Sequence, residues 1–204
     1  MSKIGFIGKD VAIEKVISSI VKGTIGSNVL TNPGFETWTE TMPDGWTLGV
    51  VGEAGATYAK ETTIVHTGNN AVKLTPGGSS SHSFAYQAFT TTTGKYYTIG
   101  FWTRHSTGES ASANLVMLNG TLITATHMYD PATEAWVAVD FENLTSYQPA
   151  ITNAYDQYFQ YDIPAPANNT LGVVLSTADT GDYYFDDISL QEQPDRVTLS
   201  DDVS

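Results

Sequence analysis

The sequence contains no cysteine, few basic residues and no long apolar run. Without cysteine, neither a disulfide framework nor a thiolate metal site can form. Nine Lys and Arg residues stand against 22 Asp and Glu residues, and the resulting net charge of −13 repels nucleic-acid phosphates and anionic membrane surfaces. No run reaches the roughly 18 uncharged apolar residues of a membrane span, and charges interrupt the N-terminal stretch where a Sec-type signal peptide would lie. We therefore expect no nucleic-acid binding, no membrane insertion and no such signal.

Sequence signatures of catalysis are also missing. None of the four histidines lies in a His-x-x-x-His pattern or has a glutamate partner at metal-binding spacing. Neither Gly-x-Ser-x-Gly nor a phosphate-binding P-loop occurs. Asp186 and Asp187 are adjacent, so on a strand they point to opposite faces and cannot flank one glycosidic bond. We expect a protein that is not an enzyme.

Residues that favour strands and turns are abundant. The chain has 11 Tyr, eight Phe and four Trp, with 18 Gly and eight Pro between short apolar runs. This pattern predicts an all-β fold, a two-sheet β-sandwich or jelly roll, and no helices separate the strands as a parallel sheet would require. The expected strands lie near residues 28–36, 45–51, 56–65, 70–75, 83–91, 95–105, 112–118, 134–141, 157–163, 170–176 and 182–191.

One short helix is expected, at residues 10–22. Asp10 can cap its N-terminus and Gly23 can end it. A helix this short is marginal in water, so its apolar face must be buried. That face either packs on the protein's own sandwich or serves in docking and oligomerisation, for which a stripe rich in isoleucine favours a homotrimer. The stripe consists of Ile13, Val16, Ile17 and Ile20.

Charge and composition divide the chain into three parts. Residues 1–28 carry a net charge of +2, which leaves −15 for the remainder. Small residues around Gly26 indicate a linker, and the last residues are polar and acidic. We expect an N-terminal attachment or oligomerisation segment at 1–27, the β-sandwich at 28–191 and a polar tail at 192–204.

Five segments in order resemble the galactose-binding-like group of carbohydrate-binding modules that are attached to xylanases and glucanases. They span residues 28–191, and the ordered set is more specific for fold than for ligand. The resemblance implies a jelly-roll sandwich of the carbohydrate-binding kind. The segments are Asn28–Glu36 (NVLTNPGFE), Pro43–Trp46 (PDGW), His66–Leu74 (HTGNNAVKL), Gly94–Arg104 (GKYYTIGFWTR) and Tyr183–Leu190 (YYFDDISL).

The same resemblance implies a structural calcium ion held by Glu36, Asp186 and main-chain carbonyls around residues 67–69. Alternation along the last strand places Asp186 on the face of Ile188 and Leu190, where a charge needs a partner. Carboxylate and carbonyl oxygens are the ligands that calcium prefers. The alternative is that Asp186 only accepts main-chain hydrogen bonds at a strand corner.

Aromatic side chains are the candidates for stacking on sugar rings. Alternation along residues 96–105 places Trp102 and Arg104 on the outer sheet face, and we expect Tyr129 and Trp136 to be exposed as well. These four residues are the predicted ligand-binding set. The alternative at each position is ordinary core or rim packing.

The segment Lys3–Lys9 (KIGFIGK) resembles the start of some tailed-phage fibre and appendage proteins. Together with the basic, apolar N-terminus on an acidic body, it favours a virion decoration or appendage protein that binds other virion proteins or itself. Its sandwich would project outward towards host-surface glycans. The alternatives are a free carbohydrate-binding protein, extracellular or in the bacterial cytoplasm, and a hydrolase of unrecognised type.

Overall fold

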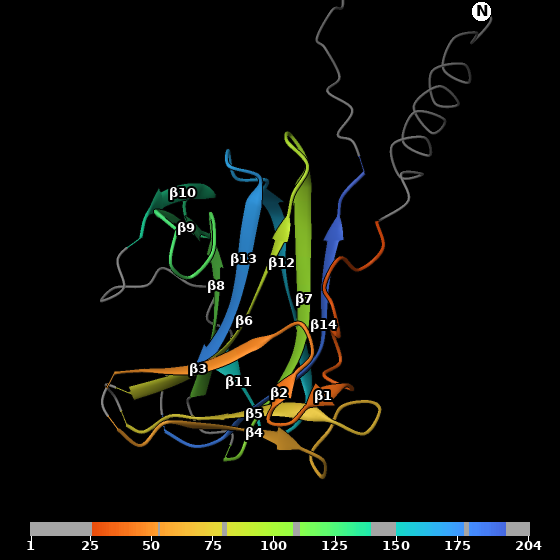
Figure 1. Ribbon diagram of the computed structural model, residues 1–204, viewed down its shortest axis with the longest axis vertical. Coiled ribbons are helices and arrows are strands. Elements are labelled where there is room, and N and C mark those ends of the chain that lie inside the picture. The colour runs from red at the N-terminus through yellow and green to blue at the C-terminus, as the bar shows by residue number, and fades with distance from the viewer. Residues whose placement is uncertain are drawn as a thin grey trace, which may run out of the picture.

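The computed structural model describes residues 26–52, 54–78, 81–107, 111–139, 150–177 and 180–194. Every regular element of these residues is a β-strand, and the strands pack as an antiparallel sandwich, which confirms the predicted all-β fold (Figure 1). The helix expected at 10–22, with its stripe Ile13, Val16, Ile17 and Ile20, lies outside the described residues. A bilayer-spanning helix would need a long apolar run, and the described part of the chain contains no such helix.

One sheet has five strands in the described part of the chain. Its order is β12 (Asp156–Pro164), β7 (Tyr96–His105), β14 (Tyr183–Glu192), β5 (Ala71–Thr75) and β4 (Thr57–Glu61). All neighbours in this sheet are antiparallel, and the two ten-residue strands β7 and β14 pair along most of their length.

The opposing sheet has seven strands among the described residues. Its order is β10 (Ala135–Ala138), β9 (His127–Asp130), β8 (Ala111–Leu118), β13 (Thr170–Thr177), β6 (Ser81–Thr90) and β3 (Thr47–Gly52), with β11 (Ala150–Ile151) paired to β8. The two-residue strands β1 (Trp38–Thr39) and β2 (Met42–Pro43) form a separate small hairpin.

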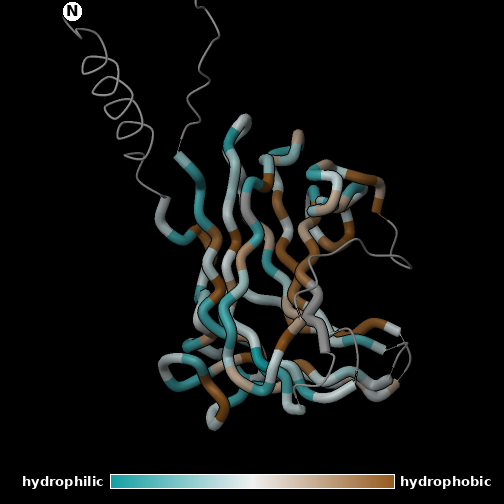
Figure 2. The backbone as a smooth tube through the Cα atoms, turned by 180° about the vertical axis from the view of Figure 1, so that it is seen from behind, coloured by the Kyte–Doolittle hydropathy of each residue, from teal (hydrophilic) through white to brown (hydrophobic). Residues whose placement is uncertain are grey.

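Alternating side chains from the two sheets fill the space between them. On β7 the buried set includes Ile99 and Phe101, and on β13 it includes Leu171 and Leu175, each with no measurable exposure. Figure 2 shows the same alternation of apolar and polar residues along the strands. Because side chains on a strand alternate between faces, Trp102 and the other even-numbered residues of β7 lie outside the core, as predicted.

Residues 28–36 do not form the strand that the sequence pattern suggested. Asn28 makes an isolated bridge to Gln191, and the chain then turns. Asn32 and Phe35 adopt positive φ angles of 49° and 53°, and the Phe35 amide donates to the Asn32 carbonyl at 3.1 Å. The Asn-Pro-Gly sequence at 32–34 is turn chemistry, and it outweighs the apolar residues on either side.

The face of Asp186 also differs from the prediction. A β-bulge interrupts the pairing of β14 with β7 between Asp186 and Ser189, and Asp187 within it has a φ of 46°. Asp186 pairs in register with Trp102, so it lies on the outer side of the sheet, whereas Ile188 lies in the core. The extra residue of the bulge shifts the alternation by one, which period-two reasoning could not anticipate.

The first and last described residues lie together at one end of the sandwich. The Gly26 amide donates to the Glu192 carbonyl at 2.9 Å, and the Val29 amide donates to the Leu190 carbonyl at 2.9 Å. Figure 1 shows this segment running beside the end of β14. Both ends of the described chain therefore leave the molecule from the same place.

Candidate functional site

The turn at 31–36, the loop at 62–70 and the bulge of β14 meet at one corner of the sandwich. Glu36, at the end of the turn, accepts main-chain hydrogen bonds from Asn69 at 3.0 Å and Asn70 at 3.2 Å. Gly68 has a φ of 65°, and a Cβ atom there would collide with the Glu36 carboxylate. Glycine at position 68 therefore lets the loop close onto Glu36.

Asp186 accepts three main-chain hydrogen bonds at this corner. The donors are the amides of His66 at 2.9 Å, Thr67 at 3.2 Å and Asp187 at 2.8 Å. The Asp186 side chain is fully buried, and this burial raises the pKa of Asp186 to about 6. The hydrogen bond from the His66 amide opposes the rise in pKa, and the charge of Asp187 adds to it. The predicted alternative, a carboxylate that accepts main-chain hydrogen bonds, is thus present.

Three acidic residues also lie around Gly34 at this corner. A Cβ atom on Gly34 would lie 3.1 Å from Asp187 Oδ1, 3.8 Å from Asp186 Oδ1 and 3.9 Å from Glu36 Cγ, so acidic side chains converge where no side chain stands. Within the described ranges, no group of three or more Asp, Glu, His or Cys side chains is arranged to hold a metal ion. The expected set has only two carboxylates, so main-chain oxygens would have to complete it, as calcium allows.

Trp102 lies on the outer face, as predicted, but a second ring covers it. His66 stacks on Trp102 with 3.8 Å between ring centroids and 16° between planes. The His66 Nδ1 atom lies 2.6 Å from Asp187 Oδ2, which also accepts from the Thr67 hydroxyl at 2.7 Å. The 62–70 loop therefore folds over the ring that was expected to be an open platform.

Arg104 is half-buried on the same outer face. Tyr184 is its register partner on β14 and is itself buried. Nearby, the Tyr155 hydroxyl donates to the Ile64 carbonyl at 3.0 Å, and burial raises the pKa of Tyr155 well above its usual range. The Arg104 Nε atom is buried with no hydrogen-bond partner among the described residues. The Arg104 side chain is therefore partly packed against the surface.

Tyr129 is not exposed, which contradicts the prediction. It is only 3% exposed, and it contacts Trp136 edge to face with 5.7 Å between ring centroids. The two residues are cross-strand partners on the β9–β10 hairpin, on the side that packs against the main core. Trp136 is half-buried there. Because strand β9 was not predicted, alternation could not be used to decide which side of this hairpin faces inward.

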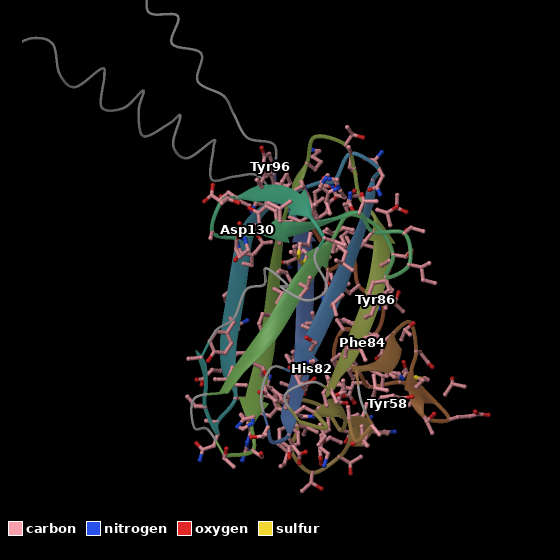
Figure 3. All side chains as sticks on the ribbon, turned by 90° about the vertical axis from the view of Figure 1, so that its left-hand side faces the viewer. Tyr58, His82, Phe84, Tyr86, Tyr96 and Asp130 are labelled. Carbon is pink, nitrogen blue, oxygen red and sulfur yellow. The ribbon has the colours of Figure 1, made fainter. Side chains whose placement is uncertain are left out.

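Sequence reasoning missed the outer face of the seven-stranded sheet. On β6 the outward residues are His82, Phe84 and Tyr86, which Figure 3 labels along the face turned to the viewer. A Cβ atom on Gly49 of β3 would collide with the Phe84 ring, and one on Gly172 of β13 would lie 3.0 Å from Tyr86 Cε2. Both rings therefore lie across glycines of neighbouring strands. A sequence signal for this face did exist, because an aromatic residue on one strand that pairs with a glycine on the next can lie flat over the sheet.

Part of this face is covered. The turn at 121–126 and the β9–β10 hairpin pack apolar side chains onto Tyr86 and its neighbours. Burial raises the pKa of Tyr86. Its hydroxyl lies near the main chain of Leu122 but makes no hydrogen bond with the described residues. Phe84 lies at the boundary of the covered part and is partly exposed. His82, two residues before it, has a buried Nδ1 atom with no hydrogen-bond partner in the described chain.

No protein-family model matches the chain, and no curated protein matches it. Solved structures do match. The enzymatically active domain of tailspike protein 4 of bacteriophage CBA120 matches with a TM-score of 0.57 and 14% identity over 80% of this chain. The CBM22-1 xylan-binding domain of Paenibacillus barcinonensis Xyn10C matches with a TM-score of 0.53 and 13% identity, covering 85% of this chain and 97% of that domain. A family 16 carbohydrate-binding module matches with a TM-score of 0.51 and 19% identity, covering 80% and 99%.

The fold is that of the jelly-roll carbohydrate-binding modules. This confirms the resemblance seen in the sequence at the level of fold. The two module structures are covered almost completely, whereas the match spans 21% of the tailspike chain. Most of the matching module structures are non-catalytic domains. Sequence identities below 20% show that the fold is similar, and they do not identify a ligand for this chain.

Proposed function

We propose that the protein is a non-catalytic glycan-binding protein, and that a polysaccharide docks on the outer face of the seven-stranded sheet around Phe84. The observation that carries the proposal is the Phe84 ring, which lies across Gly49 and is partly exposed on a jelly-roll sheet. A flat aromatic ring suits the C–H face of a pyranose. The surface around Trp102 and Arg104, which was predicted from the sequence to bind sugar, is a weaker candidate because His66 of the 62–70 loop covers the Trp102 ring.

Polar groups beside Phe84 support the same face. His82 has an unpartnered ring nitrogen, and Ser176 is the register partner of Phe84 on β13. The imidazole of His82 and the hydroxyl of Ser176 are of the kind that exchange hydrogen bonds with sugar hydroxyls. One aromatic ring with a few convergent polar groups is the usual chemistry of a small-molecule site.

The test is affinity electrophoresis in gels that contain xylan or β-1,4-galactan. Phe84→Ala should weaken the affinity for the polysaccharide about fivefold, since one lost stacking contact is of the order of 1 kcal/mol. Phe84→Tyr should retain it, and Trp102→Ala should leave it unchanged because His66 already covers that ring. If the wild-type protein is not retarded by any polysaccharide in a broad panel, a structural role replaces the proposal.

We further propose that Glu36 and Asp186 hold a structural calcium ion with main-chain carbonyls of residues 67–69. The support is the convergence of carboxylates on Gly34 and the burial of Asp186. A bound cation would offset the buried negative charge and fix the turn to the loop.

The setting that we propose is a virion, to which residues 1–27 attach the sandwich through the stripe that begins at Ile13. The segment Lys3–Lys9 and the fold likeness to a phage tailspike domain support it. The alternative is a free bacterial carbohydrate-binding protein. Capsid, portal or tail genes beside the coding sequence would favour the virion, and polysaccharide-degradation genes would favour the alternative.

A further inference from the structure

A second aromatic ring lies on the outer face of the other sheet. Phe159 of β12 is 37% exposed, which makes it one of the few large exposed apolar side chains in the described chain. It pairs in register with Gly100 of β7, which pairs on its other side with Ser189 of β14. A Cβ atom on Gly100 would lie 2.6 Å from Phe159 Cε1 and 2.7 Å from Ser189 Oγ. The ring therefore lies over the sheet at a position that glycine keeps open.

Uncharged side chains share the row of Phe159 and the row on its side away from Trp102, among the residues that the structure describes. Alternation from the core residues Ile99 and Leu190 directs Thr98, Ser189 and Gln191 outward. Gln193 donates to the Thr98 hydroxyl at 2.8 Å, and the Ser189 hydroxyl donates to the Gly100 carbonyl at 3.4 Å.

Gln157, two residues before Phe159, is exposed and pairs with Trp102. The chain carries 22 acidic residues, so a patch of amides and hydroxyls around an aromatic ring is a departure from its general surface.

The 62–70 loop ends short of this part of the face. It covers the row of Trp102 and Asp186, where His66 stacks, but the next row along the strands is Phe159, Gly100 and Ser189. Cross-strand neighbours two residues apart lie about 7 Å from each other. Phe159 and the His66–Trp102 pair are thus adjacent aromatic positions on one sheet face.

We propose that this face, centred on Phe159, is a second binding site and that its ligand is a neutral glycan. The aromatic ring offers a stacking surface, and the neighbouring amides and hydroxyls offer both donors and acceptors for sugar hydroxyls. Among the described residues, the row of Phe159, Gly100 and Ser189 and the row of Thr98 and Gln191 carry no charged side chain, which favours an uncharged ligand over a uronic acid or a sulfated sugar. The site lies on the sheet opposite the Phe84 site, so one molecule can bind two polysaccharide chains.

The experiment uses the full chain and affinity electrophoresis in xylan, in β-1,4-galactan and in alginate as the acidic comparison. Each Phe159 variant is made in the wild type and in the Phe84→Ala background, which removes the first site. In that background, Phe159→Ala should weaken the remaining affinity about fivefold in a neutral gel. Phe159→Tyr should retain binding, whereas Phe159→Leu should lose it, because stacking needs the flat ring.

Two results would overturn the second site. One is a Phe84→Ala protein that already shows no retardation, which leaves a single site. The other is evidence that an apolar protein segment covers the ring. Either Phe159→Leu binding as well as wild type or a shift in sedimentation on Phe159→Ala would provide that evidence. If Phe159→Ala abolishes retardation while Phe84→Ala leaves it unchanged, the proposed site at Phe84 is wrong and the site at Phe159 stands.

Discussion

Carboxylates at the turn–loop corner are held by different donors. Glu36 binds the amides of residues 69 and 70, Asp186 binds amides of residues 66, 67 and 187, and Asp187 faces His66. Apart from the local bond between Asp187 and Asp186, each of these contacts joins segments that are more than 30 residues apart in sequence. Cation binding at this corner would therefore act on the joint between the turn, the loop and β14.

Removal of calcium should lower the melting temperature. An ion that binds only the native state stabilises it by mass action, by about 3 kcal/mol at one hundred times its dissociation constant. We expect the wild type to melt lower in chelator than in excess calcium, and Asp186→Ala to show no such difference. Asp130→Ala is the matched control, because this carboxylate accepts only local hydrogen bonds from Ala132 and Thr133. Identical wild-type curves in the two buffers would rule out a site of useful affinity.

Asp182 should contribute pH-dependent stability. Burial alone would raise its pKa, but hydrogen bonds from Thr75 at 2.6 Å and Lys73 at 3.2 Å, with the Lys73 charge, lower the pKa of Asp182 below its ordinary value. A lowered pKa stabilises the fold above about pH 4 and ceases to do so as the pH falls through the folded value.

Asp182→Asn should therefore lower the unfolding free energy by about 1 kcal/mol at pH 7. The difference from wild type should shrink at pH 3. Urea unfolding at both pH values measures it, with the exposed Glu40→Gln as control. A difference that is the same at both pH values would mean that lost packing, and not charge, is responsible.

Single residues were predictable where strand alternation decides their environment. Trp102 was predicted to lie on the outer face, and it does. The cover over Trp102 was not predictable, because His66 reaches it through a loop that no local pattern describes. Asp186 was given the right neighbours, Glu36 and residues 67–69, from the resemblance, but the wrong sheet face.

At the scale of elements, long strands were predicted to within a few residues. The segments 83–91, 95–105 and 170–176 correspond to β6, β7 and β13. Short strands such as β9 and β11 were missed because four or two residues carry too little periodicity. The bulge in β14 is also invisible in sequence, since its Asp187 is not a glycine despite a positive φ.

The N-terminal segment provides a prediction at this scale. Deleting residues 1–25 leaves the Gly26–Glu192 hydrogen bond in place, so the sandwich should remain folded and soluble. If the Ile13 stripe serves attachment, the truncated protein should sediment as a monomer while the full chain forms an oligomer or joins its particle. Sedimentation of both forms measures this. Unfolding or aggregation of the truncated form would show that the segment belongs to the sandwich core.

At the scale of the whole molecule, charge is the dominant property. A net charge of −13 on 204 residues produces self-repulsion that destabilises the compact state. Raising NaCl from about 10 mM to about 500 mM shortens the Debye length from about 30 Å to under 5 Å. The melting temperature should rise by a few degrees as repulsion is screened, measured in chelator so that calcium does not contribute. A fall would mean that attractive pairs such as Lys73–Asp182 outweigh the repulsion.

The meeting of Gly26 and Glu192 has a consequence for how this sandwich can be combined with other proteins. Because Gly26 and Glu192, near the two ends of the sandwich, are joined by a 2.9 Å hydrogen bond, residues 26–192 can be spliced into a surface loop of a host domain without being pulled apart. The same proximity permits circular permutation, with a short linker closing the old ends and new ends opened in an exposed turn. The sandwich is therefore a portable unit, which can be inserted within another chain as readily as it can be fused to one end.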